Sequence, residues 1–119
     1  MTVLTKQLSA ISREALRRHF LALPPEDVRL RFGSSMSAEG IYAYVDKFDF
    51  DRDAVLGVFD ENLQLTGVAH LALAPEHDAA ELGVSVLPEH RGQGIGTALF
   101  ERAVEMQTGN KHVDAEKSK

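Results

Sequence analysis

The sequence contains no cysteine and no tryptophan. Without cysteine, the protein has no disulfide bond, no zinc site with thiolate ligands and no thiol nucleophile, and nothing points to an oxidising compartment. No apolar run approaches the roughly 20 residues of a transmembrane helix, and the N-terminus lacks the basic and then apolar order of a signal peptide. We therefore expect a cytoplasmic protein that does not enter a membrane.

Basic residues are in the minority, with 13 Lys and Arg against 18 Asp and Glu, and the net charge at pH 7 is −5. This balance provides no broad positive surface, so we expect no nucleic acid partner. An acidic body can still hold an anionic cofactor at one place. The chain has 119 residues of which 44% are hydrophobic, and this predicts one domain with a moderate core.

One acidic run resembles the start of a calcium-binding loop, because Asp49, Asp51 and Asp53 alternate along the chain. An EF-hand loop also needs a glycine at its sixth position and a glutamate at its twelfth. Those positions hold Ala54 and Asp60. We therefore predict a solvated connector here and no metal site.

Alternation of apolar and polar residues predicts three strands, at 54–59, 64–73 and 81–87, joined by short polar turns. Strands connected in this way form an antiparallel meander. A further edge strand is predicted at 3–8. Residues 29–32 are interpreted as a short extended piece.

Helical spacing predicts two helices before the meander and one after it. The first begins after Ser12 and is stopped by Pro24 and Pro25, and the second begins at Ser37. The third carries Ile95, Leu99, Ala103 and Met106 on one face. Two helices before an antiparallel meander and one helix after it indicate an α/β protein of the α+β type.

A loop with alternating glycines, Arg91-Gly-Gln-Gly-Ile-Gly96, joins the last predicted strand to the last helix. Glycine can take positive φ and has no Cβ, so the backbone N–H groups there can close on a ligand. The helix N-terminus adds unpaired N–H groups and a positive dipole end, which suit phosphate. The spacing fits neither a P-loop nor a dinucleotide-binding fingerprint. A glycine-rich turn without a ligand is the alternative interpretation.

This loop resembles the acyl-CoA-binding motif of the GNAT superfamily of N-acyltransferases, Arg/Gln-x-x-Gly-x-Gly/Ala. As in that family, a Val-x-Val strand (Val84–Val86) and Pro88 precede it. The order of predicted elements over residues 3–108 also resembles the GNAT fold. The resemblance implies an antiparallel meander flanked by helices.

The resemblance implies transfer of an acetyl group from acetyl-CoA to a small-molecule or peptide amine, without a covalent enzyme intermediate. Backbone groups of the Val-x-Val strand would pair with pantetheine, and the glycine loop would hold the pyrophosphate. The implied residues for CoA are Val84, Ser85, Val86, Arg91, Gly92, Gln93, Gly94, Ile95, Gly96 and Thr97. Glu81, at the start of the last strand, is the predicted catalytic base.

His70, on the middle strand, is a second candidate for the base. Both residues also have a purely structural interpretation. Glu81 would then be a solvent-facing strand residue, and His70 would lie on a sheet face.

In the GNAT family the motif-bearing helix is followed by a parallel strand, another helix and further strands. Residues 109–119 are polar, with Val113 as the one β-branched apolar residue, and are not expected to form that buried strand. We therefore expect a partial GNAT domain over 1–108, a polar C-terminal tail over 109–119, and missing C-terminal strands. The unpaired edge of 81–87 then favours a homodimer.

In the GNAT family the C-terminal strands normally help to form the slot for pantetheine, so their expected absence also affects the expected activity. We expect CoA binding to persist while transfer by this chain is slow. The alternative is a CoA-binding or self-associating module without catalysis.

Overall fold

The computed structural model describes residues 3–74, 79–108 and 114–118, which form a five-stranded sheet in the order β1-β2-β3-β4-β5 with helices on both faces. Neighbours among the first four strands are antiparallel, and β5 is parallel to β4. The elements are β1 (Lys6–Gln7), α1 (Arg13–Leu21), α2 (Pro25–Phe32), α3 (Ala38–Asp46), β2 (Ala54–Phe59), β3 (Leu65–Ala74), β4 (Ala79–Val86), α4 (Ile95–Thr108) and β5 (Asp114–Ser118). The predicted α+β class and the antiparallel meander are confirmed.

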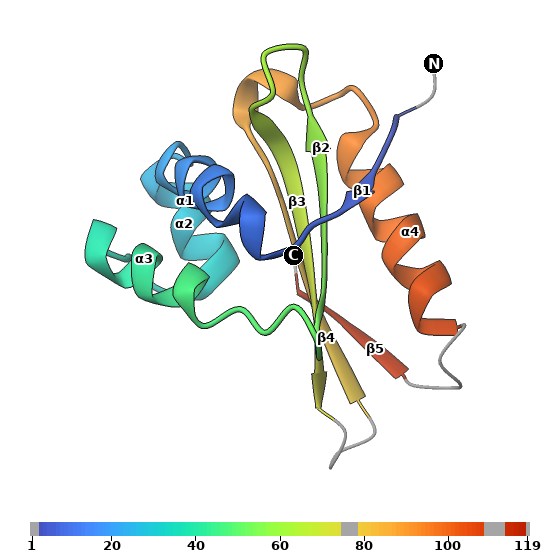
Figure 1. The fold of residues 1–119 in the computed structure, drawn as a ribbon. Coiled ribbons are helices and arrows are strands. Elements are labelled where there is room, and N and C mark those ends of the chain that lie inside the picture. The colour runs from blue at the N-terminus through green and yellow to red at the C-terminus, as the bar shows by residue number, and fades with distance from the viewer. Residues whose placement is uncertain (1–2, 75–78, 109–113, 119) are drawn as a thin grey trace.

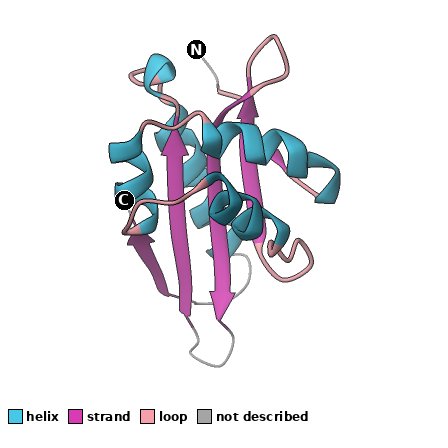
Figure 2. Ribbon diagram, turned by 90° about the vertical axis from the view of Figure 1, so that its left-hand side faces the viewer, coloured by secondary structure: helices cyan, strands magenta, loops and turns pink. Residues whose placement is uncertain are grey.

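Helices α1, α2 and α3 lie on one face of the sheet and α4 lies on the other (Figure 1). Figure 2 shows the three-helix layer lying across the strands, with β5 at the edge of the sheet. Side chains alternate between the faces along each strand. Val55 and Val68 pack under α1–α3, whereas Ala69 and Leu82 pack under α4, so the sheet separates two hydrophobic clusters.

The turn between β2 and β3 is fixed by Asp60, whose Oδ1 accepts hydrogen bonds from the backbone N–H groups of Asn62 (2.8 Å) and Gln64 (2.9 Å). Such side-chain bonds to the following backbone are why aspartate favours turns. The predicted β2–β3 turn is confirmed. The predicted edge strand at 3–8 is shorter in the structure, where pairing with β2 covers Lys6 and Gln7.

The third helix begins where Ser37 predicts it, and Ser37 Oγ accepts a hydrogen bond from Gly40 N–H at 3.1 Å. The extended interpretation of 29–32 is wrong, because these residues complete α2. Proline at the first helical position needs no N–H partner, so Pro25 both ends the preceding segment and starts α2. Gly33, with φ of 83°, then ends this helix in the left-handed conformation.

The prediction that no strand follows α4 is wrong, because residues 114–118 form β5 and pair with β4. Strand pairing joins backbone groups, and the exposed edge of β4 provides them whatever the side chains of the incoming segment. The pairing runs from Ala79↔Asp114 to Gly83↔Ser118. It leaves Val84–Val86 outside the β5 register, which is the part of the edge that a ligand or a second chain could reach. The homodimer stays a prediction.

Within the described ranges, none of the helices has both the length and the apolar character that crossing a bilayer requires.

Candidate functional site

A cavity of about 500 Å³ opens between α2, the end of β4 and the glycine loop. Its walls come from three places in the sequence. Leu23, Asp27, Leu30 and Arg31 come from the segment after α1 and from α2, Val84, Ser85 and Val86 from β4, and His90, Arg91, Gly92, Gly94, Ile95, Gly96 and Thr97 from the loop and the start of α4. All ten residues predicted to bind CoA except Gln93 therefore line one cavity.

The glycine loop has the geometry that an anion cradle needs. Gly92 and Gly94 both have φ of 82°, and a Cβ added to either would meet no atom within 4 Å. The left-handed backbone conformation at these two positions favours glycine. Because glycine has no side chain, the space beside both residues stays open. Gly96 differs, because it lies in α4 and its added Cβ would meet Val86 Cγ2 at 3.6 Å.

The first turn of α4 points its N–H groups at this loop. The first intrahelical hydrogen bond runs from Ala98 N–H to Gly94 O (3.0 Å). The N–H groups of Ile95, Gly96 and Thr97 precede it and so have no partner within the helix. The residues present therefore fit a pyrophosphate, since a phosphate oxygen can accept from several of these groups at the positive end of the dipole.

The free part of the β4 edge has the orientation predicted for pairing with pantetheine. Leu87 N–H donates to Thr66 O on β3 (2.9 Å). Because main-chain groups alternate in direction along a strand, those of Val84 and Val86 point away from β3 and toward the cavity side. The backbone of Ser85 points toward β3 instead. Ser85 lines the cavity but does not offer its main chain to it.

Arg91 supports the loop and is not aimed into open space. Its guanidinium donates to Val86 O through Nε (3.2 Å) and Nη2 (3.1 Å), and Nη2 also forms an ion pair with Asp27 Oδ2 at 2.6 Å. The charge of Arg91 is therefore largely offset by Asp27 across the cavity mouth. One acceptor of the β4 edge, Val86 O, is occupied by this arginine.

The side chain of Ser85 lies on the face of the sheet that α1, α2 and α3 cover, and it contacts His19 of α1. His19 is 2% exposed and bonds through both nitrogens, Nδ1 with Leu65 O (3.0 Å) and Nε2 with Ser85 Oγ (2.8 Å). A carbonyl oxygen can only accept, so the proton is on Nδ1 and Ser85 donates to Nε2. Burial lowers the pKa of His19 to about 4, so this histidine is neutral and structural at pH 7.

This pKa shift makes the stability of the fold depend on pH. Below the unfolded-state pKa of 6.5 the unfolded chain binds a proton at His19 that the folded chain does not, so the free energy of unfolding falls between pH 6.5 and about 4 and levels off below. The expected loss is about 3 kcal/mol. Urea titrations of the wild type and of His19→Asn over this range measure it. The variant keeps a donor for Leu65 O, and a stability difference between the two proteins that is independent of pH would contradict the prediction.

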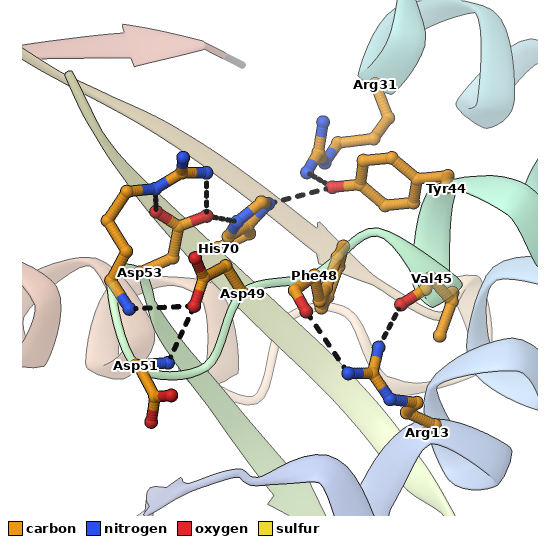
Figure 3. A network of polar contacts seen from close by, with 10 residues as sticks. Arg13, Arg31, Tyr44, Val45, Phe48, Asp49, Asp51, Asp53 and His70 are labelled. Carbon is orange, nitrogen blue, oxygen red and sulfur yellow. Dashed lines mark hydrogen bonds and ion pairs between the residues drawn. The ribbon is translucent and has the colours of Figure 1, made fainter.

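A second polar cluster lies on the same face of the sheet as His19 (Figure 3), and one of its members, Arg31, lines the cavity. Arg31 Nη2 donates to Tyr44 Oη (2.6 Å), Tyr44 Oη bonds with His70 Nδ1 (3.0 Å), and His70 Nε2 bonds with Asp53 Oδ2 (2.9 Å). Asp53 also forms an ion pair with Arg52 at 2.9 Å. The network links α2, α3, β3 and the segment before β2.

The two candidates for the base differ in this environment. His70 uses both ring nitrogens within the network, its side chain is 12% exposed, and burial lowers its pKa even though Asp53 acts in the opposite direction. Glu81 is exposed. Gly83 opposes His70 in the β3–β4 register, and Glu81 lies two residues earlier on the same face, so the two candidates are diagonal neighbours.

Sequence reasoning missed two residues of this network. Asp53 was interpreted as part of a solvated connector, yet it is 5% exposed. The helical spacing of Ile41, Tyr44 and Phe48 predicts a core position for Tyr44, and it does contact Phe20, Phe32 and Phe48, but its hydroxyl also belongs to the network. The available signal was a carboxylate directly before β2, two residues from Val55, which is the register partner of His70 on β3.

The acidic run itself forms a local turn, in which Asp49 Oδ1 accepts from the N–H groups of Asp51 and Arg52, both at 3.1 Å. In the part of the chain that the structure describes, no group of three metal-ligating side chains comes together.

The comparisons with known proteins agree with this fold. Residues 14–115 match the family model described as the acetyltransferase (GNAT) family. A search of the curated proteins found no match.

Solved structures with the same fold include the GNAT domain of PAT from S. lividans, with 17% identity and a TM-score of 0.70 over 88% of this chain and 65% of that one. A ribosomal-protein-alanine N-acetyltransferase from Brucella melitensis has 20% identity and a TM-score of 0.67, over 92% and 69% of the two chains. A phosphinothricin acetyltransferase from Sinorhizobium meliloti, solved with AcCoA, has 19% identity and a TM-score of 0.69, over 92% and 61%. This chain thus spans about two thirds of the length of each.

The family match covers most of the sequence, and it includes the meander, the glycine loop and α4. By this match, the chain belongs to the GNAT acetyltransferase family.

Proposed function

We propose that this protein transfers an acetyl group from acetyl-CoA to an amine. The observation that supports the proposal most directly is the cavity of about 500 Å³ that joins the glycine loop to the free part of the β4 edge. The loop suits the pyrophosphate and the edge suits an extended amide-bearing arm, so one continuous cavity matches the two halves of CoA. The bound thioester would supply the acetyl group.

Within this proposal, the backbone of Val84 pairs with the pantetheine arm and the N–H groups of Gly92 to Thr97 hold the pyrophosphate. Gln93 and Thr97 are exposed and contribute through the backbone of the loop and of the first helical turn. Arg91 braces Val86 and Asp27, which keeps the loop in its binding conformation. Fixing the thioester against an acceptor in this way can account for a large part of the rate.

We propose Glu81 as the group that takes the proton from the acceptor amine. Glu81 is exposed on β4, three residues before the cavity-lining Val84, whereas His70 already bonds Asp53 and Tyr44 through both nitrogens. Loss of a general base costs about 10² to 10⁴ in rate. We therefore expect Glu81→Gln to lower kcat/KM for an amine by that factor while the Kd for CoA stays within about twofold. Equal turnover by the variant and the wild type would exclude this role.

The transfer itself is tested by measuring CoA release from acetyl-CoA with a thiol reagent in the presence of a panel of amines. The chain has no cysteine to interfere. We expect release that requires both the protein and an amine, together with an acetylated amine detected by mass spectrometry. If calorimetry shows CoA binding but no amine supports release, the protein is a CoA-binding module and the proposed transfer is wrong.

A further inference from the structure

Arg31 occupies a specific place beside β4. It lines the cavity, and its guanidinium lies where a side chain at position 83 would be, since a Cβ added to Gly83 would come within 2.6 Å of Nη2 and 2.7 Å of Nε. Gly83 is three residues from Val86, which is about 10 Å along a strand. Arg31 is thus separated from the glycine loop and lies at the opposite end of the cavity.

The orientation of Arg31 is fixed by the polar network. Because a guanidinium can only donate, Tyr44 Oη accepts from it and directs its own proton to His70 Nδ1, which leaves the His70 proton on Nε2 facing Asp53. Figure 3 shows Tyr44 between Arg31 and His70, with Asp53 on the far side of His70. Asp53 is buried, and Tyr44 packs edge to face against the ring of Phe32. A side chain held through a chain of bonded and packed neighbours is pre-organised for binding.

The charge of Arg31 is not offset as that of Arg91 is. Across the cavity, Asp27 pairs with Arg91 at 2.6 Å, and among the residues that the structure describes no ion pair within 4 Å includes Arg31. Burial is the main cause of the lowered pKa of both His19 and His70, and the charge of Arg31 acts in the same direction, so it disfavours a second cation nearby. An acceptor that enters as a bare ammonium ion would be repelled in the same way.

We propose that the acceptor is an amine that also carries a carboxylate, and that Arg31 binds this carboxylate while the amine faces Glu81. The inference rests on the proposed acetyl transfer. Glu81 and Gly83 are two residues apart on one face of β4, so their Cα atoms are about 7 Å apart. Because the Arg31 guanidinium lies over Gly83, this separation suits a small amino acid held between Arg31 and Glu81. One unpaired cation matches the single negative charge of a carboxylate, whereas a dianionic phosphate would leave one charge without a partner in an already acidic protein.

The test uses binding, so it does not depend on turnover. The Kd of N-acetyl derivatives of α-, β- and γ-amino acids is measured by calorimetry in the presence of CoA, beside the matching amides and N-acetyl phosphoethanolamine. We expect at least one acid to bind wild type about 10- to 100-fold more tightly than its amide. Arg31→Gln should remove that preference and leave the Kd for CoA within about twofold.

Two further variants distinguish an effect of the Arg31 guanidinium on binding from a general effect on the fold. Gly83→Ala keeps Arg31 but displaces its guanidinium, and should weaken binding of the acid without weakening that of the amide. Arg29→Gln, an exposed arginine of the same helix, is the matched control and should bind like the wild type.

The results distinguish this inference from the proposed transfer. Equal binding of acids and amides by the wild type, tighter binding of the phosphate compound, or a loss of CoA affinity in Arg31→Gln would overturn the carboxylate site. A carboxylate preference without any CoA release would support the Arg31 site and contradict acetyl transfer. Release of CoA with carboxylated and uncharged amines alike would contradict the Arg31 site alone.

Discussion

Replacement of Gly94 by Asp is expected to weaken CoA binding about 1,000-fold. The substitution adds a negative charge beside the N–H groups of the first turn of α4, where the pyrophosphate would be held. A like charge about 4 Å from a phosphate costs about 4 kcal/mol near a protein surface, which corresponds to roughly that factor. Gly94 also has φ of 82°, a conformation that aspartate adopts with some strain. Calorimetry with CoA measures the change.

The control for this variant is Gly33→Asp. Gly33 has nearly the same conformation, with φ of 83°, and a Cβ added there also meets no atom within 4 Å. It ends α2 and lies outside the glycine loop, so Gly33→Asp should lose similar stability and keep its CoA affinity. Gly94→Ala then separates strain from charge, because it introduces a Cβ without the carboxylate. If both aspartate variants bind CoA as tightly as the wild type, the glycine loop is not the phosphate site.

The meander and the strand-to-helix loop could be predicted because their signals are local. Alternating apolar residues define β2 and β4, and the turn at Asp60 depends on bonds between residues at most four apart. The glycines at 92 and 94 have the positive φ expected of them. Such features are determined by neighbours in the sequence, so a pattern is enough to find them.

What could not be predicted depends on neighbours that are distant in the sequence. Asp53 is buried because His70, 17 residues later, is paired beside it, and Arg31 is oriented by Tyr44, 13 residues later. The parallel strand β5 likewise depends on an edge of β4 that only the folded sheet creates. Pro25 was interpreted as the end of one helix because the sequence does not show whether a proline stops a helix or starts the next.

The second large effect is expected from Phe20→Ala, which should lower the free energy of unfolding by about 3–5 kcal/mol. Phe20 is 0% exposed and contacts the rings of His19, Phe32 and Tyr44 at centroid distances of 5.1, 5.6 and 5.4 Å. Its removal leaves a cavity between α1, α2 and α3 that rigid neighbours cannot fill. Because domains are stable by about 5–15 kcal/mol, the melting temperature should fall by roughly 15–25 °C.

The matched control is Leu21→Ala, one position along the same helix, where the side chain is 42% exposed and the loss should be below about 1 kcal/mol. Phe20 also supports Tyr44, and Tyr44 holds Arg31, so a cavity at Phe20 loosens the group that we assign to the acceptor carboxylate. Well below its melting temperature, Phe20→Ala should therefore bind CoA normally and lose part of its preference for carboxylated ligands. Loss of CoA affinity together with that preference would mean that the two ends of the cavity are not independent.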